Sequence, residues 1–135
     1  MPAESVDGLF AKFIDAGTPI LAHANGDAAA DLFVNALNRS IDTSNIPDHR
    51  TVMIHAQTVR EDQLDIMAEM KAIPSFFSAL TFYWGDWHRN SVFGVERASR
   101  ISPTQSSLDK GIVFTVHNDS PGSTAGYDPL TQGNH

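Results

Sequence analysis

"TPILAHANGDAAADLFVNALNRS", residues 18–40, is the stretch that decides the fold. It begins with an almost continuous apolar run, residues 18–24, which is typical of a short strand buried on both faces. The polar turn "NGD" follows, and residues 28–40 then place apolar side chains at helical spacing. A buried strand that leads through a tight turn into an amphipathic helix is the repeating unit of an α/β fold.

The same unit recurs along the chain. Short apolar runs predict four strands, at residues 18–24, 50–56, 73–80 and 112–118. Helical spacing and capping residues predict helices at residues 4–16, 28–40, 59–72, 95–102 and 103–111. The aromatic, aperiodic stretch 81–94 is typical of a long loop. This order predicts parallel strands joined by right-handed crossovers, with helices covering the sheet.

The composition is that of one acidic globular domain. The chain has 135 residues, 41% of them hydrophobic, and a formal net charge of -7. It therefore has no electrostatic footprint for nucleic acid or an anionic membrane, and a small-molecule partner fits better. Because cysteine is absent, histidine and carboxylate are the ligands left for a transition metal. The sequence shows no secretory signal or membrane-spanning run, and a cytoplasmic location is expected.

Three of the predicted strands end on or near a histidine. His23 and His55 lie at the ends of the first and second strands, and His117 and Asp119 lie at the end of the fourth. Ligands of parallel α/β folds bind beyond the carboxyl ends of the strands, so these residues are expected on one rim. Each histidine has a structural alternative, because an imidazole can satisfy a neighbouring carbonyl. The grouping as a whole predicts a divalent metal with nitrogen and oxygen ligands.

Two aspartates also have two interpretations each. Asp119 either caps the turn "NDSP" or acts as the base that takes a proton from a metal-activated water. His117 lies two positions earlier, on the same face of an extended strand, where it is a candidate substrate contact, a partner of the ligands or rim packing. Asp27 is expected to cap the helix 28–40, with a hydrogen bond to His23 as the alternative.

The stretch "FYWGDWHR", residues 82–89, carries most of the aromatic character of the predicted loop. One interpretation is an aromatic plug that packs over the mouth of the sheet. The other is the wall of a substrate pocket, built from Tyr83, Trp84, Trp87 and His88. The two interpretations are compatible, so Trp84, Trp87 and His88 are candidate substrate-binding residues.

Four segments together resemble the carboxyl-terminal half of the metal-dependent amidohydrolases of the YtcJ-like branch. They are "HANGDAA", "IHAQTVREDQLDIMAEMKAIPSFFSA", "FYWGDWHR" and "ERASRISPTQSSLDKGIVFTVHNDSP", and the resemblance extends over residues 5–121. It implies a (β/α)8 barrel of the TIM type, in which this chain supplies strands five to eight. Residues 1–121 would form that half-barrel, and residues 122–135 an irregular tail.

The resemblance also implies roles for single residues. In that superfamily the histidines that end strands five and six bind metal, and they match His23 and His55. The aspartate after strand eight binds metal and acts as the general base, and it matches Asp119. The implied cofactor is a divalent metal, zinc, and the implied reaction is hydrolysis of an amide-type C–N bond in a small molecule.

The chain departs from the family pattern in several places. It contains no His-x-His, which the family uses on strand one, and the bridging carboxylate of strand three or four is also missing. Leu80 occupies a position where the family has a histidine. A complete barrel takes about 250 residues, and the relatives continue after "HNDSP" into a proline-rich loop and an eighth helix. The remaining ligands are therefore expected in a missing amino-terminal half.

Two other classes of function stay open at this point. A half-barrel exposes two sheet edges and an apolar inner face, so a non-catalytic scaffold that forms a homo-oligomer is one alternative. A small flavodoxin-like binding domain is another, although the chain lacks a glycine-rich phosphate loop.

Overall fold

A computed structural model describes residues 2–44 and 46–119. Its elements, in chain order, are α1 (Ala3–Asp15), β1 (Leu21–Ala24), α2 (Asp27–Thr43), β2 (Val52–His55), α3 (Glu61–Met70), β3 (Ile73–Phe76), α4 (Ser78–Trp87), the π-helical turn η1 (His88–Val92), α5 (Gly94–Ala98), α6 (Thr104–Asp109) and β4 (Thr115–Val116). Within these described residues, no helix has the length and apolar character needed to cross a bilayer. The predicted tail, residues 122–135, lies outside them.

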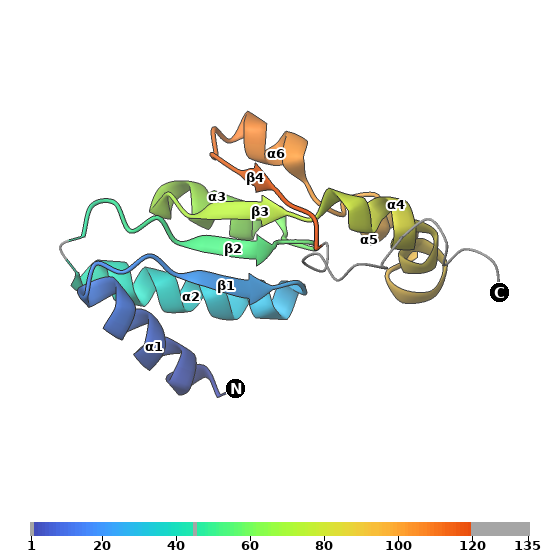
Figure 1. Ribbon diagram of the computed structural model, residues 1–135. Coiled ribbons are helices and arrows are strands. Elements are labelled where there is room, and N and C mark those ends of the chain that lie inside the picture. The colour runs from blue at the N-terminus through green and yellow to red at the C-terminus, as the bar shows by residue number, and fades with distance from the viewer. Residues whose placement is uncertain (1, 45, 120–135) are drawn as a thin grey trace, which may run out of the picture.

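The strands form one parallel sheet in the order β1-β2-β3-β4, and Figure 1 shows their carboxyl ends at the same edge. In the register, His23 lies level with Ile54, and Ile54 lies level with Ser75. A parallel sheet joined by helices confirms the predicted α/β class and is consistent with part of a TIM-type barrel.

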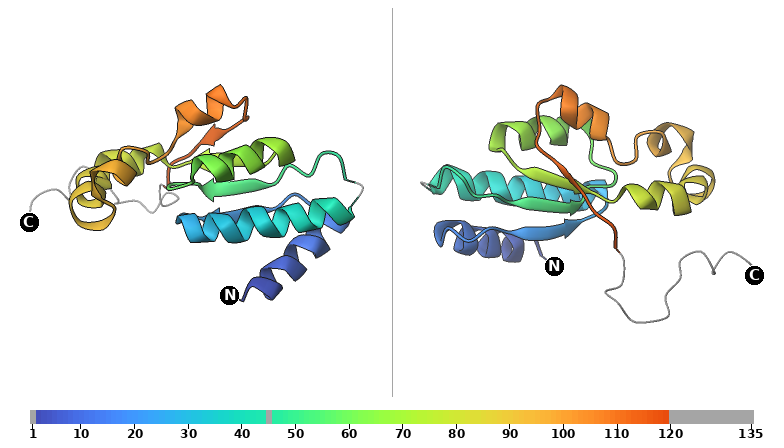
Figure 2. Two further views of the ribbon diagram at one scale, coloured as in Figure 1. Left: turned by 180° about the vertical axis from the view of Figure 1, so that it is seen from behind. Right: turned by 45° about the horizontal axis from the view of Figure 1, so that its top comes forward.

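Helices α2 and α3 cover one face of the sheet, as the reverse view in Figure 2 shows. The buried core lies between them and the strands, where Met53 and Phe76 are fully buried. Helix α1 packs against α2 through an edge-to-face contact of Phe10 with Phe33, whose ring centroids are 5.4 Å apart. Only one face of the sheet therefore has a helix layer within the described residues.

The prediction that the first strand is buried on both faces is wrong. Leu21 is 67% exposed and His23 is also exposed, whereas Ala24 is buried. Strand β1 is an edge strand, and alternate side chains of a strand point to opposite faces. The residues that point away from the helix layer are therefore open, although the sequence around them is apolar throughout.

The prediction of a loop over residues 81–94 is also wrong, because α4, η1 and α5 occupy most of that stretch. The third strand accordingly ends at Phe76 rather than at residue 80, and α4 begins at Ser78. None of the residues of α4 is buried. A helix with no buried face does not need a repeating apolar stripe, and this explains why helical periodicity was absent from the sequence.

Candidate functional site

Three histidines lie at the carboxyl edge of the sheet, as predicted from the ends of their strands. His23 is in β1, His55 is the last residue of β2, and His117 follows β4 directly. The backbone N–H of His117 donates to the carbonyl of Phe76 at 3.0 Å, which ties this residue to the end of β3. Strand direction and register therefore bring these residues from distant parts of the chain to one rim.

The His55 side chain departs from the alternation of its strand. Met53, two positions earlier, points into the helix-covered core, and strict alternation would send His55 to the same side. His55 and Ala56 instead have positive φ values of 74° and 46°. This left-handed backbone is uncommon for residues other than glycine, although histidine is among the more tolerant. It ends the strand and allows the imidazole to reach the rings of His23 and His117.

His55, His117 and Asp119 form the tightest group of metal-ligand side chains in the described part of the chain. One ligand atom from each lies within 4.8 Å of the others. Nε2 of His117 is 3.3 Å from Nδ1 of His55 and 3.4 Å from Oδ1 of Asp119. Nε2 of His55 is 3.6 Å from Oδ2 of Asp119. Two imidazoles and a carboxylate at this spacing form a donor set for a divalent cation.

His23 lies beside this group rather than within it. Its ring meets that of His55 edge to face, with the centroids 4.5 Å apart and the planes at 76°. The sequence analysis predicted His23, His55 and Asp119 as metal ligands and His117 as a substrate contact. The structure brings all four to one rim, and His117 is the histidine that directly faces both His55 and Asp119.

Two side chains of the site were missed by the sequence reasoning, Ser75 and Phe77. The hydroxyl of Ser75 lies 2.8 Å from Nδ1 of His117. The ring of Phe77 stacks on that of His117, with a centroid distance of 5.7 Å and an angle of 21°. Their position in the sequence could have identified them. Both lie near the end of the third strand, two residues apart, and the alternation of a strand places such residues on one face.

Burial lowers the pKa of His55 below its ordinary value. The charge of Asp119 acts in the opposite sense, and the neighbouring imidazoles of His23 and His117 add to the lowering. Hydration stabilises a charged imidazole, and burial removes that hydration, so burial favours the neutral form. The neutral form is the one that can donate a lone pair to a metal.

The aromatic residues predicted to contact substrate form a separate cluster. Trp84 and Trp87 meet edge to face at 6.1 Å and are each about half exposed, and His88 stacks on Phe93 at 5.1 Å. None of the ring contacts found in residues 2–44 and 46–119 joins this cluster to His55 or to the other rim histidines. Figure 1 shows α4 and α5 beyond the carboxyl ends of the strands, on the side where the histidines lie.

Two ion pairs hold this aromatic segment against the rim. Arg97 of α5 donates to Asp27 at 3.0 Å, and Arg100 donates to Glu61 at 2.5 Å. Asp27 and Glu61 are the first residues of α2 and α3. The predicted cap role of Asp27 is therefore wrong: Gly26 is the N-cap residue, and the Asp27 carboxylate binds Arg97 and the N–H of Ala28 rather than His23.

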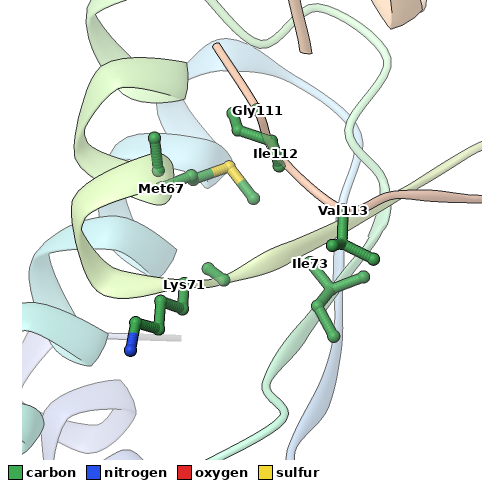
Figure 3. Close-up of a pocket in the computed structure, with 8 residues that line it drawn as sticks. Met67, Lys71, Ile73, Gly111, Ile112 and Val113 are labelled. Atoms are coloured by element: carbon green, nitrogen blue, oxygen red, sulfur yellow. The ribbon is translucent and has the colours of Figure 1, made fainter. Parts of the chain in front are cut away.

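Two of the hollows in the described part of the chain do not include His55, His117 or Asp119 in their lining. Figure 3 shows one of about 200 Å³ between α3 and the segment before β4, lined by Met67, Lys71 and Ile112 among others. It lies at the opposite end of β3 from the histidines, because Ile73, the first residue of the strand, borders it. The other, of about 520 Å³, is mainly apolar and lies between α1, β1 and α2, with His23 in its lining.

The family model described as "Amidohydrolase family" matches residues 1–132. Among solved structures, the chain is similar to uncharacterized metal-dependent hydrolases from Pyrococcus furiosus, with a TM-score of 0.71 and 24% identity, and from Pyrococcus horikoshii OT3, with a TM-score of 0.70 and 23% identity. These similarities cover 90% of this chain but only 24% and 23% of the two structures, so the chain spans about a quarter of their length. No curated protein matches it.

Proposed function

The chain belongs to the amidohydrolase family, and we propose that it supplies part of the active site of a metal-dependent hydrolase. In this proposal the strands β1 to β4 are strands five to eight of a (β/α)8 barrel of the YtcJ-like branch. The substrate is a small molecule with an amide-type C–N bond, and the metal is zinc. The remaining strands and ligands come from an amino-terminal half.

The observation that carries the proposal is the convergence of His55, His117 and Asp119 at the carboxyl rim of the sheet. Active sites of TIM barrels lie at this face. Ligand atoms of a tetrahedral zinc site with bonds of about 2.1 Å are about 3.4 Å apart. A zinc ion takes one nitrogen from each imidazole, and one ligand atom from each of the three residues lies within 4.8 Å of the others. The residues present therefore supply ligand types that suit zinc, gathered within reach of a single ion.

Each site residue has a role in the proposed reaction. His23, His55 and Asp119 hold the metal, as the resemblance implies. A bound zinc ion would polarise the substrate carbonyl and lower the pKa of water. Asp119 is half exposed, so its carboxylate can take a proton from an attacking water and pass it to the leaving nitrogen.

The aromatic cluster supplies the proposed substrate wall. Trp84 and Trp87 present about half of their surface to solvent, and the ion pairs of Arg97 and Arg100 hold their segment at the rim. Together with His88 they would recognise an apolar or aromatic part of the substrate. Leu80, in α4, stands where the family has a histidine, and it favours an apolar substrate group at that position.

Metal content tests the proposal directly. The full 135-residue chain is loaded with zinc chloride, dialysed and analysed by mass spectrometry beside the double variant His23→Ala, His55→Ala. We expect zinc in the unaltered chain and its loss in the double variant. His88→Ala is the matched control, because this histidine lies in the aromatic cluster and should leave the zinc content unchanged. Equal zinc content in the unaltered chain and the folded double variant contradicts the proposal.

The exposed edge of the sheet favours a second candidate function, that of a self-associating scaffold. Leu21 and Val116 lie in the two outer strands and are 67% and 56% exposed. Pairing of β1 with a second copy would cover its free edge and bury such apolar surface. Sedimentation distinguishes the two functions: a zinc-free dimer supports the scaffold, and a zinc-binding monomer contradicts it.

A further inference from the structure

We propose that Ser75 positions His117 in the metal site, so that Nε2 of His117 is held toward His55 and Asp119 whether or not zinc is bound. The inference rests on the proposed function, because it assigns a task within that site. It adds His117 to the residues that bind the cation and Ser75 as its positioning residue.

The geometry restrains His117 on three sides. The Ser75 hydroxyl meets Nδ1 at 2.8 Å, and the backbone N–H of His117 donates to Phe76 at 3.0 Å. The Phe77 ring stacks on the imidazole at 5.7 Å. With Nδ1 occupied and the ring plane held, the remaining nitrogen is the one 3.3 Å from His55 and 3.4 Å from Asp119.

Because Ser75 is buried, losing its hydrogen bond to His117 would be costly. Ser75 is only 4% exposed, and a buried hydroxyl without a partner is costly. Because water has little access to this buried hydroxyl, it depends on His117 as its hydrogen-bond partner in the folded protein. Rotation of the ring away from Asp119 would break it.

A hydroxyl is suited to this position because it can both donate and accept a hydrogen bond. For the metal-free site the proposal assigns the Nε2–H tautomer, in which Nε2–H donates to the carboxylate of Asp119 and Nδ1 accepts from Ser75. If His117 held zinc through Nε2, that nitrogen would present its lone pair, and the proton would reside on Nδ1, where it would be donated to the Ser75 oxygen. The imidazole changes tautomer while the ring stays in place. A backbone carbonyl or a carboxylate could accept but not donate, and would favour the second tautomer alone.

The tautomer of His117 is measurable by NMR on the full chain with ¹⁵N-labelled histidine, at about pH 8, where an ordinary histidine is neutral. Two-bond ¹H–¹⁵N correlations distinguish protonated from unprotonated ring nitrogens. We expect the Nε2–H tautomer in metal-free protein and the Nδ1–H tautomer after addition of zinc chloride. The variant His117→Gln assigns the signals.

Calorimetric zinc titration provides the second readout. Ser75→Ala should weaken zinc binding by about 10-fold or more, the range found when such supporting hydrogen bonds are removed. Ser75→Thr keeps the hydroxyl and should restore most of the affinity. Ser107→Ala is the matched control, because Ser107 is also fully buried but its hydroxyl donates to Pro103, away from the site.

The outcomes separate the inference from the function on which it rests. Zinc binding with an unchanged His117 tautomer, or with equal affinity in folded Ser75→Ala, overturns the role of Ser75 and leaves the hydrolase proposal standing. Failure of the unaltered chain to bind zinc chloride overturns both. A tautomer change together with rescue by Ser75→Thr supports the inference, since a purely structural hydroxyl would not control which ring nitrogen carries the proton.

Discussion

Nε2 of His117 lies 3.3 Å from Nδ1 of His55, although the residues are 62 positions apart in the chain. The contact forms because β2 and β4 run parallel on either side of β3, so that their carboxyl ends meet at one edge. Asp119 lies against both imidazoles. This pair of histidines with its carboxylate is the feature on which the proposed hydrolase function depends.

Asp119 should be essential for metal binding. In Asp119→Asn the carboxylate becomes a neutral amide, which is a weaker ligand for zinc, and the affinity should fall about 10-fold or more. Calorimetric titration with zinc chloride measures the change. Asp48→Asn is the matched control, because Asp48 is exposed and pairs with Arg50 before β2, at the other end of the sheet. Equal losses in the two variants would show a non-specific charge effect instead.

Phe76 should contribute strongly to stability. Its side chain is fully buried against the helix layer, and Phe76→Ala should lower the free energy of unfolding by about 3–5 kcal/mol, through lost burial and the cavity that remains. Urea denaturation followed by circular dichroism measures this. Phe82→Ala makes the same chemical change at a residue that is 84% exposed, and it should cost less than about 0.5 kcal/mol. Similar costs would mean that the core lies elsewhere.

Asp31 should make stability depend on acid pH. Hydrogen bonds from Arg60, and then from Gln63, hold the pKa of Asp31 below its ordinary value. The stabilisation is present above the unfolded-state pKa and is lost as the pH falls through the lower folded-state pKa. Because the pair is well exposed, it contributes at most about 1 kcal/mol.

The variant Asp31→Asn tests this dependence. Urea denaturation at several pH values should show it less stable than the unaltered chain near neutrality, and the difference should shrink as the pH falls through the lowered pKa of folded Asp31. Asp42→Asn, at an exposed position of the same helix, is the control. A stability gap that stays constant down to acid pH would count against the assigned ion pair.

The two arginines that tie the aromatic segment to the rim should control its exposure to protease. Removing both in Arg97→Ala, Arg100→Ala breaks the contacts with Asp27 and Glu61, which join α5 and the turn that follows it to the starts of α2 and α3. Each exposed pair is worth about 0.2–1 kcal/mol, so opening of the segment should become several-fold more frequent. Chymotrypsin, which cuts after aromatic residues, should then cleave faster between residues 82 and 93.

The matched control for that experiment is Arg50→Ala, which removes another exposed ion pair, with Asp48, before β2. Its cleavage rate in the aromatic segment should equal that of the unaltered chain. If the double variant is cleaved no faster than this control, the aromatic segment is held by its own packing and the ion pairs are incidental.

Local sequence alone determined the alternation of strands and helices. The apolar runs and the helical stripes are repeated within short windows, and the carboxyl edge of a parallel sheet then follows from chain direction. His23, His55 and Asp119 were predicted at that edge because each follows an apolar run. The confirmed part of the fold is therefore the part that depends on periodicity and on the direction of the strands.

Only the tertiary structure decided how the rim is built. The left-handed backbone at His55 turned its side chain toward His117, and the strand order placed Ser75 beside the same histidine. Helix α4 was not predicted, because it buries no face and so carries no apolar period. These features depend on contacts between segments that are distant in sequence, and residue order within a short window carries no information about which side chains such contacts bring together.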